Sequence, residues 1–194
     1  MCFLTARLFG DPHVVTLDGH KYTFNGKGEF ILVESADEGF ILQGRMVAPP
    51  SFTANQTTIS RSVFSALVAK EENADTVQIE ITEQGLVSFV NGRNVDFSVL
   101  PSQRYANVTL SDNGNNTISA SFSSGATVTV TGRNQIITDI VVTLPDTFRH
   151  TTRGLLGQFN GDPSDDLLPR NNSIPLPLNA SLETIHYNFG LTCK

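Results

Sequence analysis

Short apolar runs separated by turn residues most constrain what this 194-residue chain can fold into. Residues 76–82 alternate in type, so that Val77, Ile79 and Ile81 lie on one face and polar side chains on the other. A strand with one buried face requires this alternation. Similar runs, rich in Val, Ile, Phe and Thr, recur near residues 13–17, 20–24, 29–33, 39–48, 59–68, 86–90, 94–99, 107–111, 117–122, 126–131 and 136–143. The pattern predicts an all-β protein.

The residues between these runs predict tight antiparallel connections. Asn91-Gly92 separates two of the runs, and both residue types accept the positive φ angles of a type I′ hairpin turn. The pairs Asn25-Gly26, Asn113-Gly114 and Ser124-Gly125 are similar. Strands connected this closely pair mostly antiparallel, so we expect an antiparallel β-sandwich of two sheets.

The last quarter of the chain has a different character. Residues 163–177 are rich in Pro, Asn and Asp and are expected to be irregular. Residues 181–190 predict a short helix that Ser181 caps and Gly190 ends.

Length and charge limit the class of protein. The length suits one domain, residues 1–194, with a substantial core. The formal net charge is −6 and the basic residues are scattered, so the sequence predicts no nucleic-acid partner. It contains neither a run of roughly 20 apolar residues nor an N-terminal signal pattern. We therefore expect part of a longer protein, with any membrane contact made by segments outside these residues.

Five glycosylation sequons favour an extracellular or cell-surface location. Their asparagines are Asn55, Asn107, Asn115, Asn171 and Asn179.

The only two cysteines, Cys2 and Cys193, stand at opposite ends of the chain. They are either a disulfide that closes almost the whole domain or two unrelated thiols. An extracellular setting favours the disulfide. Such a closure would stabilise the fold by roughly 4–5 kcal/mol.

The segment Gly10-Asp11-Pro12-His13 contains a chemically labile bond. An Asp carboxylate can attack its own carbonyl carbon, and the tertiary proline nitrogen leaves once it is protonated. His13 stands beside the bond as a candidate proton donor. The alternative is an ordinary turn, for which Asp-Pro is well suited. A second such bond joins Asp162 to Pro163.

An acidic segment near the C-terminus predicts a calcium loop. Asn160, Asp162, Asp165 and Asp166 place oxygen-bearing side chains around a glycine turn, and calcium takes six to eight oxygen ligands. The segment lacks the distal bidentate Glu of an EF-hand. Further ligands would be backbone carbonyls, water or a distant residue such as Asp11. Magnesium suits an all-protein site less well. The alternative is an acidic surface turn whose side chains cap backbone groups.

Chemistry on an external substrate has little support in the sequence. It contains no Gly-x-Ser-x-Gly and no His-Glu-x-x-His motif. The four histidines are too dispersed to predict a zinc site. Asp165 and Asp166 are adjacent on one predicted loop, which rarely lets two carboxylates straddle a glycoside.

Two segments together resemble the von Willebrand factor type D domain. The first comprises residues 9–13, with Leu17-Asp-Gly19 and Tyr22-Thr-Phe-Asn-Gly26, and the second runs from Gly154 to Leu167. The sequence is most similar to the type D domains of transmembrane mucins and of sushi-domain cell-surface proteins. It departs from the secreted, polymer-forming members at Leu156, where those usually carry cysteine.

The resemblance implies a function and a set of site residues. It implies calcium in the acidic loop, held by Asn160, Asp162, Asp165 and Asp166. It also implies self-cleavage between Asp11 and Pro12, with Asp11 as nucleophile and His13 as helper. The module would have a structural or interaction role without an external substrate, and its partners would be other extracellular proteins or neighbouring domains.

Two other classes of function remain open at this point. One is a glycan-binding or glycan-hydrolysing β-sandwich. The other is a lipid-transport accessory module, because type D domains also occur in lipid-carrying egg-yolk proteins.

Overall fold

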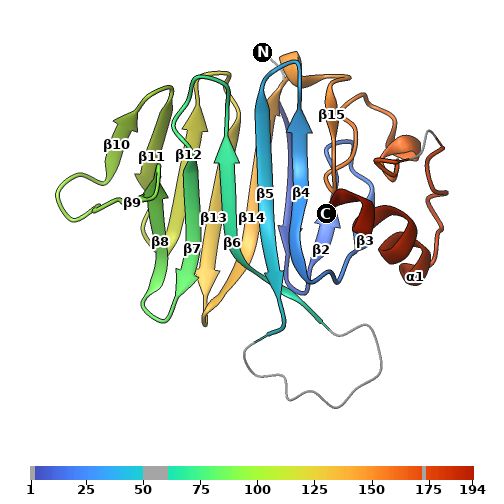
Figure 1. Cartoon of the computed structure of the whole chain (residues 1–194), viewed down its shortest axis with the longest axis horizontal. Helices are drawn as coiled ribbons and strands as arrows, with labels where there is room; N and C mark the ends of the chain where they lie inside the picture. Colours follow the sequence, from blue (N-terminus) through green and yellow to red (C-terminus); the bar gives the residue numbers. More distant parts are fainter. Residues whose placement is uncertain (1–2, 50–60, 172–173) are drawn as a thin grey trace.

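The computed structural model of the chain describes residues 3–49, 61–171 and 174–194 (Figure 1). These residues form fifteen strands: β1 (Phe3–Phe9), β2 (His13–Val15), β3 (Lys21–Thr23), β4 (Gly28–Ser35), β5 (Phe40–Val47), β6 (Val63–Lys70), β7 (Val77–Thr82), β8 (Gly85–Val90), β9 (Arg93–Asn94), β10 (Ser102–Tyr105), β11 (Val108–Asp112), β12 (Thr117–Phe122), β13 (Thr127–Arg133), β14 (Ile136–Pro145) and β15 (Thr152–Arg153). The helical turns are η1 (Asp146–Phe148), η2 (Pro163–Asp165), α1 (Leu182–Thr184), η3 (Ile185–Phe189) and η4 (Gly190–Cys193). None of the described helices is long and apolar enough to cross a membrane.

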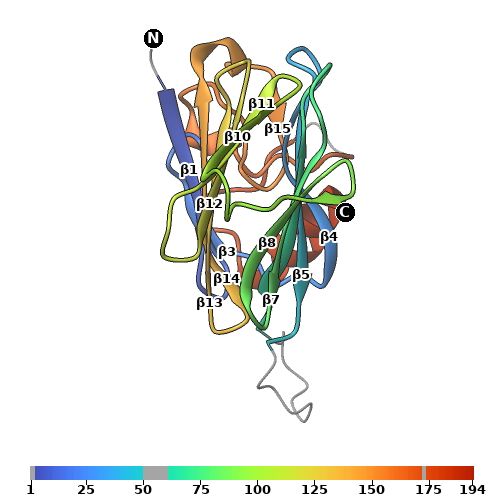
Figure 2. The same ribbon diagram turned by 90° about the vertical axis from the view of Figure 1, so that its left-hand side faces the viewer.

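All the strands belong to one antiparallel network. Its main path is β10-β11-β12-β13-β14-β6-β5-β4-β15. A first branch begins at β14 and runs β1-β2-β3, and a second begins at β6 and runs β7-β8-β9. A twisted sheet of this many strands curls or splits, and Figure 2 shows β1, β13 and β14 in one layer facing β4, β5 and β7 in another. The two layers are joined where Ile137 of β14 pairs with Phe64 of β6. The prediction of an all-β antiparallel fold is confirmed, but the strands form one folded sheet where two separate sheets were expected.

Aromatic side chains fill the space between the layers. Six phenylalanines are fully buried. Phe40 meets the edges of Phe122 and Phe148 with ring centroids 5.3 and 5.8 Å apart, a favourable arrangement for aromatic pairs. The alternation predicted in residues 76–82 is present, with Val77 and Ile79 buried in this core and Ile81 partly buried against it.

Most predicted strands are found near their expected positions, but β1, β10 and β15 were missed. The predicted run at 94–99 is mostly a turn that follows β9. Asn91 and Gly92 form the predicted positive-φ turn, with φ of 50° and 77°. Asn25-Gly26 does not form such a turn. Gly26 is needed there for packing, since a Cβ on it would lie 2.6 Å from the Phe30 ring.

The C-terminal helix begins as predicted and ends later. The Ser181 hydroxyl accepts a hydrogen bond from the Thr184 N–H at 3.1 Å and caps α1. Gly190 does not end the helical segment, which continues through η3 and η4 to Cys193. A Cβ on Gly190 would overlap the ring of Phe24, so this glycine permits close packing on the core.

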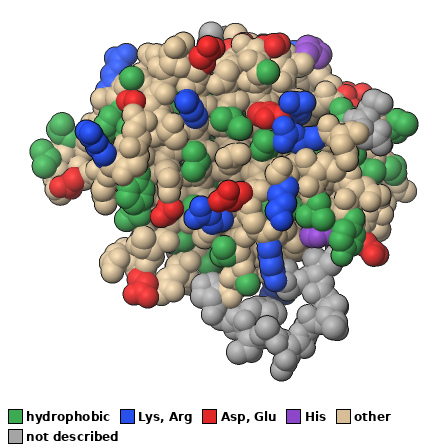
Figure 3. All heavy atoms as spheres, in the orientation of Figure 1, with side chains coloured by type: hydrophobic (Ala, Val, Ile, Leu, Met, Phe, Trp, Pro, Cys, Tyr) green, Lys and Arg blue, Asp and Glu red, His purple; other side chains and the backbone are tan. Residues whose placement is uncertain are grey.

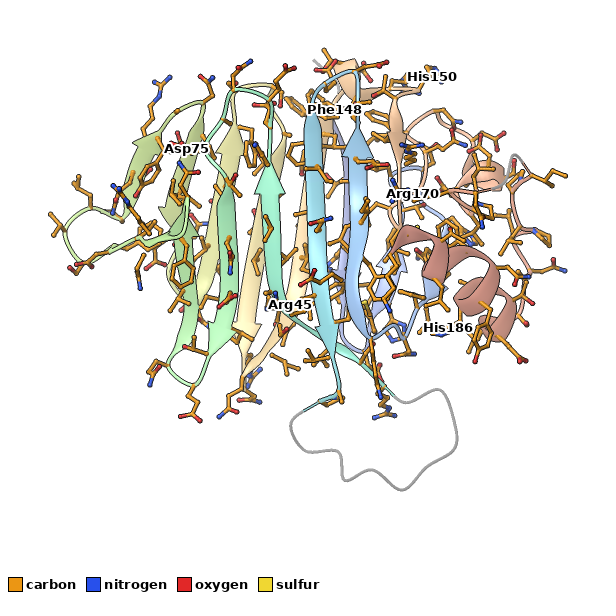
Figure 4. The ribbon with its side chains drawn as sticks, viewed as in Figure 1. Arg45, Asp75, Phe148, His150, Arg170 and His186 are labelled. Atoms are coloured by element: carbon orange, nitrogen blue, oxygen red, sulfur yellow. The ribbon has the colours of Figure 1, made fainter. Side chains whose placement is uncertain are left out.

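Ion pairs fasten the irregular C-terminal segment to the sheet. Glu34 on β4 accepts from Arg170 at 2.7 Å and from Arg153 at 2.5 Å. Figure 4 shows Arg170 beside the upper part of β4 and β15, above the helical turns. The chain on both sides of the predicted acidic loop is therefore held against β4, near the sheet edge formed by β15.

Candidate functional site

The two sequence motifs meet at the end of β2. The Leu17 N–H donates to the Leu156 carbonyl at 3.0 Å. The buried hydroxyl of Thr16 donates to the Asp166 carboxylate at 2.6 Å. The hairpin of β2 and β3 thus presents the residues after β2 to the acidic loop at 158–166.

Asp18 is the central contact between the motifs. Its Oδ2 accepts the backbone N–H groups of Asn160, Gly161 and Asp162 at 2.9, 2.7 and 3.1 Å. Consecutive N–H groups that converge in this way form an anion-binding nest, and bonds to a carboxylate are stronger than neutral ones. The sequence motifs did not indicate Asp18 as a site residue. No local spacing rule could have found it, because it lies 142 residues from Asn160.

Within the loop, three of the four predicted ligands bond to one another or to the backbone. Asn160 Oδ1 accepts from the Asp162 N–H at 2.8 Å, and Asn160 Nδ2 donates to Asp165 Oδ2 at 2.7 Å. Asp162 Oδ1 accepts from the hydroxyl and N–H of Ser164, which lowers the pKa of Asp162. Asp162 therefore caps η2 at the exposed edge of the loop.

Asp166, the fourth predicted ligand, is almost fully buried. Its Oδ1 accepts from the Gln158 N–H at 3.0 Å and its Oδ2 accepts from Thr16. Burial raises the pKa of the Asp166 carboxyl from 3.8 to about 7, and the negative charges of Asp18 and Asp165 add to the rise. Gly157 makes room for this carboxylate, since a Cβ there would overlap Asp166 Oδ1.

Two carboxylate oxygens beside this network lack a partner. Asp18 Oδ1 and Asp165 Oδ1 are buried and accept no hydrogen bond from the residues that the structure describes. An unsatisfied buried charge is costly, so such atoms call for an explanation. Hard cations such as calcium prefer carboxylate and amide oxygens.

The residues of the loop therefore fit a calcium ion chemically, although the described side chains do not form a complete ligand cage. No three His, Cys, Asp or Glu side chains within the described ranges are grouped closely enough to hold a metal. A cation here would take oxygens from Asp18 and Asp165, supplemented by the Asn160 amide, backbone carbonyls or water.

Asp11 lies at the other end of β2, in the turn after β1. Its Oδ2 is 2.9 Å from Arg61 Nε, and its Oδ1 is 3.9 Å from His13 Nε2. His13 Nδ1 is 3.1 Å from the Thr23 hydroxyl, which orients the ring. The structure places Asp11 beside Arg61 and His13, and it is Asp18 that contacts the acidic loop. Arg61 was not predicted as part of this cluster.

The cysteine prediction falls partly outside the described residues, because Cys2 lies there. Cys193 is buried, with its Sγ 3.9 Å from the Phe189 carbonyl oxygen. Burial raises the pKa of the Cys193 thiol to about 12. The Cys2–Cys193 disulfide stays a prediction.

Three of the predicted sequons lie wholly within the described residues. Asn107, Asn115 and Asn179 are all exposed. Asn55 lies outside the described ranges. Asn171 is described and exposed, but the other two residues of its sequon are not.

Charged side chains do not segregate on the face shown in Figure 3, where acidic and basic groups are intermixed. Several are paired, such as Arg45 with Glu29 at 2.9 Å. This face offers no continuous basic surface of the kind that nucleic acid requires.

The all-β fold, with its N-terminal motif clamped to an acidic C-terminal loop, defines the class of domain. The family model of the von Willebrand factor type D domain matches residues 6–173, and the chain belongs to this family. The resemblance predicted from the two motifs is confirmed.

Relatives with this domain are extracellular or cell-surface proteins. Mouse Mucin-4 (Mus musculus) is 35% identical over 95% of this chain, and human Sushi domain-containing protein 2 (Homo sapiens) is 34% identical over 83% of it. Zonadhesin of Sus scrofa is 30% identical over 86%. The matched regions make up 5%, 20% and 6% of these relatives, respectively. The predicted extracellular or cell-surface location is confirmed.

Proposed function

We propose that this chain is a calcium-binding structural and adhesion module of a larger extracellular or cell-surface protein. The observation that carries the proposal is the pair of buried, unpartnered oxygens on Asp18 and Asp165, next to a third buried carboxylate. Mucin-4 and zonadhesin, which contain related sequence, support the adhesive and structural role. Its partners would be neighbouring domains or other extracellular proteins.

Calcium would stabilise the contact between the acidic loop and the β2–β3 hairpin. Bound calcium would neutralise the facing carboxylates, and Asp18, Asp165 and the Asn160 amide would hold it. Asp166 would stay ionised beneath the loop, bonded to Thr16 and Gln158. The loop would then be rigidly fixed to the β2–β3 hairpin, which gives the module a defined surface for its neighbours.

The test is a calcium titration of protein freed of metal by chelation. We expect about one calcium per chain by elemental analysis after dialysis, and a melting temperature that rises with calcium because the ion binds only the folded state. Magnesium at the same concentration serves as the control and should have a smaller effect. An unchanged melting temperature and no bound calcium would refute the proposal.

We also propose that the module cuts itself between Asp11 and Pro12. An Asp11 carboxylate oxygen would attack the Asp11 carbonyl carbon and form a cyclic anhydride as the bond to the Pro12 nitrogen breaks. That nitrogen would take up a proton, with His13 as the nearby donor, and water would open the anhydride. Arg61, 2.9 Å from the carboxylate, would position it. The expectation of cleavage comes from the resemblance of the Gly10–His13 segment to mucin-type domains.

Cleavage is tested by N-terminal sequencing of reduced protein after incubation at about pH 5–6, where His carries a proton. A new terminus at Pro12 is expected, and it should be absent from Asp11→Ala. Asp162→Ala is the matched control, since it alters the other Asp-Pro bond. A single intact chain after days of incubation would refute self-cleavage, and calcium binding would remain testable separately.

An enzyme that acts on external glycans is the main alternative. Asp165 and Asp166 belong to one loop and are bonded within it, which disfavours a glycosidase pair. We infer that the module has no external substrate, and turnover in a glycosidase assay would contradict this. A lipid-transport role would appear as a mass difference between native and delipidated protein.

A further inference from the structure

A cleft opens where three hairpin turns meet, at the lower end of the sheet in Figure 1. The turns join β7 to β8, β11 to β12 and β13 to β14, and the cleft has a volume of about 650 Å³. This volume lies within the range of small-molecule sites, roughly 300–1,000 Å³. The acidic loop and the Asp11 turn contribute no residue to the lining, so neither of the proposed activities uses the cleft.

The lining of the cleft combines amides with an apolar floor. Gln84, Asn134 and Gln135 contribute side-chain donors and acceptors, and Leu86 and Phe97 contribute apolar surface. Polar groups predominate in the lining, because the carboxylates of Glu83 and Asp112 stand beside these amides and the apolar side chains cover a smaller part. A sugar presents both hydroxyls and an apolar ring face, so it suits this combination.

Asn116 makes the wall of the cleft rigid. Its Oδ1 accepts from the Leu86 N–H at 2.7 Å in one layer, and its Nδ2 donates to the Gly132 carbonyl at 2.8 Å in the other. The Gly132 N–H also bonds to the Asn116 carbonyl at 3.0 Å. One side chain in the turn between β11 and β12 therefore joins β8 to β13, and the cleft is formed before any ligand binds.

The neighbouring residue, Asn115, lines the cleft and begins a glycosylation sequon with Asn116 and Thr117. Asn115 is exposed, and its side chain has no hydrogen-bond partner in the part of the chain that the structure describes. By contrast, Asn107 Nδ2 donates to the Asn73 carbonyl at 2.9 Å. Asn115 Nδ2, the atom to which a glycan attaches, is thus free at the cleft.

We propose that Asn115 carries an N-linked glycan and that its first sugars lie in this cleft. The occupant is then the chain's own glycan, attached at the edge of its binding site. Covalent attachment gives a high effective concentration, so individually weak contacts are sufficient to hold the sugars. The glycan would cover the ends of three hairpins and shield this end of the domain.

The test compares glycan release from two sites of the folded, secreted chain. Protein from a glycosylating host is treated with an endoglycosidase under native conditions, and peptide mass mapping follows release at Asn115 and Asn179. We expect release at Asn115 to be about tenfold slower, as for roughly 1.4 kcal/mol of protection. After denaturation the two rates should agree. An unmodified Asn115, or equal rates in the native protein, would overturn the proposal.

Variants of the cleft separate sugar contacts from simple crowding at the turn. Gln84→Ala combined with Gln135→Gly removes two lining amides, and glycine suits the positive φ of 61° at residue 135. Occupancy at Asn115 should stay the same while its release becomes several-fold faster. Gln43→Ala, an exposed amide on β5, is the control and should change neither. Slow release that persists in the double variant would overturn the assignment of the sugars to the cleft.

Discussion

Asp18→Asn is the sharpest test of how the two motifs hold each other. The substitution keeps the size of the side chain but removes its charge, so the three N–H bonds to residues 160–162 lose their charge-assisted character. A bond to a charged group contributes about 1.5–3 kcal/mol net. Gly161 and Asp162 are exposed, so water can replace part of what is lost. We therefore expect a loss of about 2–4 kcal/mol in calcium.

The loss of stability in Asp18→Asn should depend on calcium, so the assay compares melting temperatures with and without the ion. For a domain of this size, 1 kcal/mol corresponds to about 2–4 °C in melting temperature. The variant should therefore melt about 4–16 °C below the wild type in calcium. In chelator the difference should be smaller, because Asp18→Asn also relieves repulsion with Asp165 and Asp166. Saturating the wild type at about 100 times its Kd adds about 2.7 kcal/mol, and the variant should lack most of this gain.

The measurement is thermal unfolding followed by circular dichroism, with and without calcium. Asp37→Asn is the matched control, since Asp37 is exposed and far from the loop in sequence. An equal calcium gain in Asp18→Asn and wild type would refute Asp18 as a calcium ligand. Equal melting temperatures in calcium would refute its role as a clamp between the motifs.

Three further predictions concern single side chains. Because the folded-state pKa of Asp166 is raised from 3.8 to about 7, its favourable contribution is complete below the unfolded pKa and is lost as the pH rises through about 7. Between about pH 4 and pH 8, the free energy of unfolding of the chelated protein should thus fall by roughly 4 kcal/mol. The melting temperature in EDTA should change less with pH for Asp166→Asn than for the wild type. Gly157→Ala should lower the free energy of unfolding in urea more than Gly19→Ala does. Both glycines have positive φ, but only a Cβ at residue 157 overlaps another group. Equal losses in the two variants would contradict the packing argument. Asn116→Ala should cost about 1–3 kcal/mol by leaving the Leu86 N–H unpaired, whereas Asn113→Ala, at an exposed turn, should cost under about 1 kcal/mol.

The sequence by itself determined the elements whose signals are local. Alternation placed β7 and its buried face, because neighbouring side chains on a strand point to opposite sides. Asn91-Gly92 marked its hairpin because the required φ angles belong to those two residues. The family itself was evident from two short motifs. Calcium binding by the acidic residues at 160–166 stays a prediction.

Tertiary structure alone decided the contacts between distant segments. β1 was missed because its partner, β14, lies more than a hundred residues away, with Phe3 opposite Pro145. The contacts of Asp18 with Asn160 and of Arg61 with Asp11 were missed for the same reason, since no spacing rule links the residues of either pair. The roles of Gly26 and Gly190 also depended on where Phe24 packs. Side-chain periodicity reports which face of a strand is buried, but the partner that covers it is set only when the whole sheet has folded.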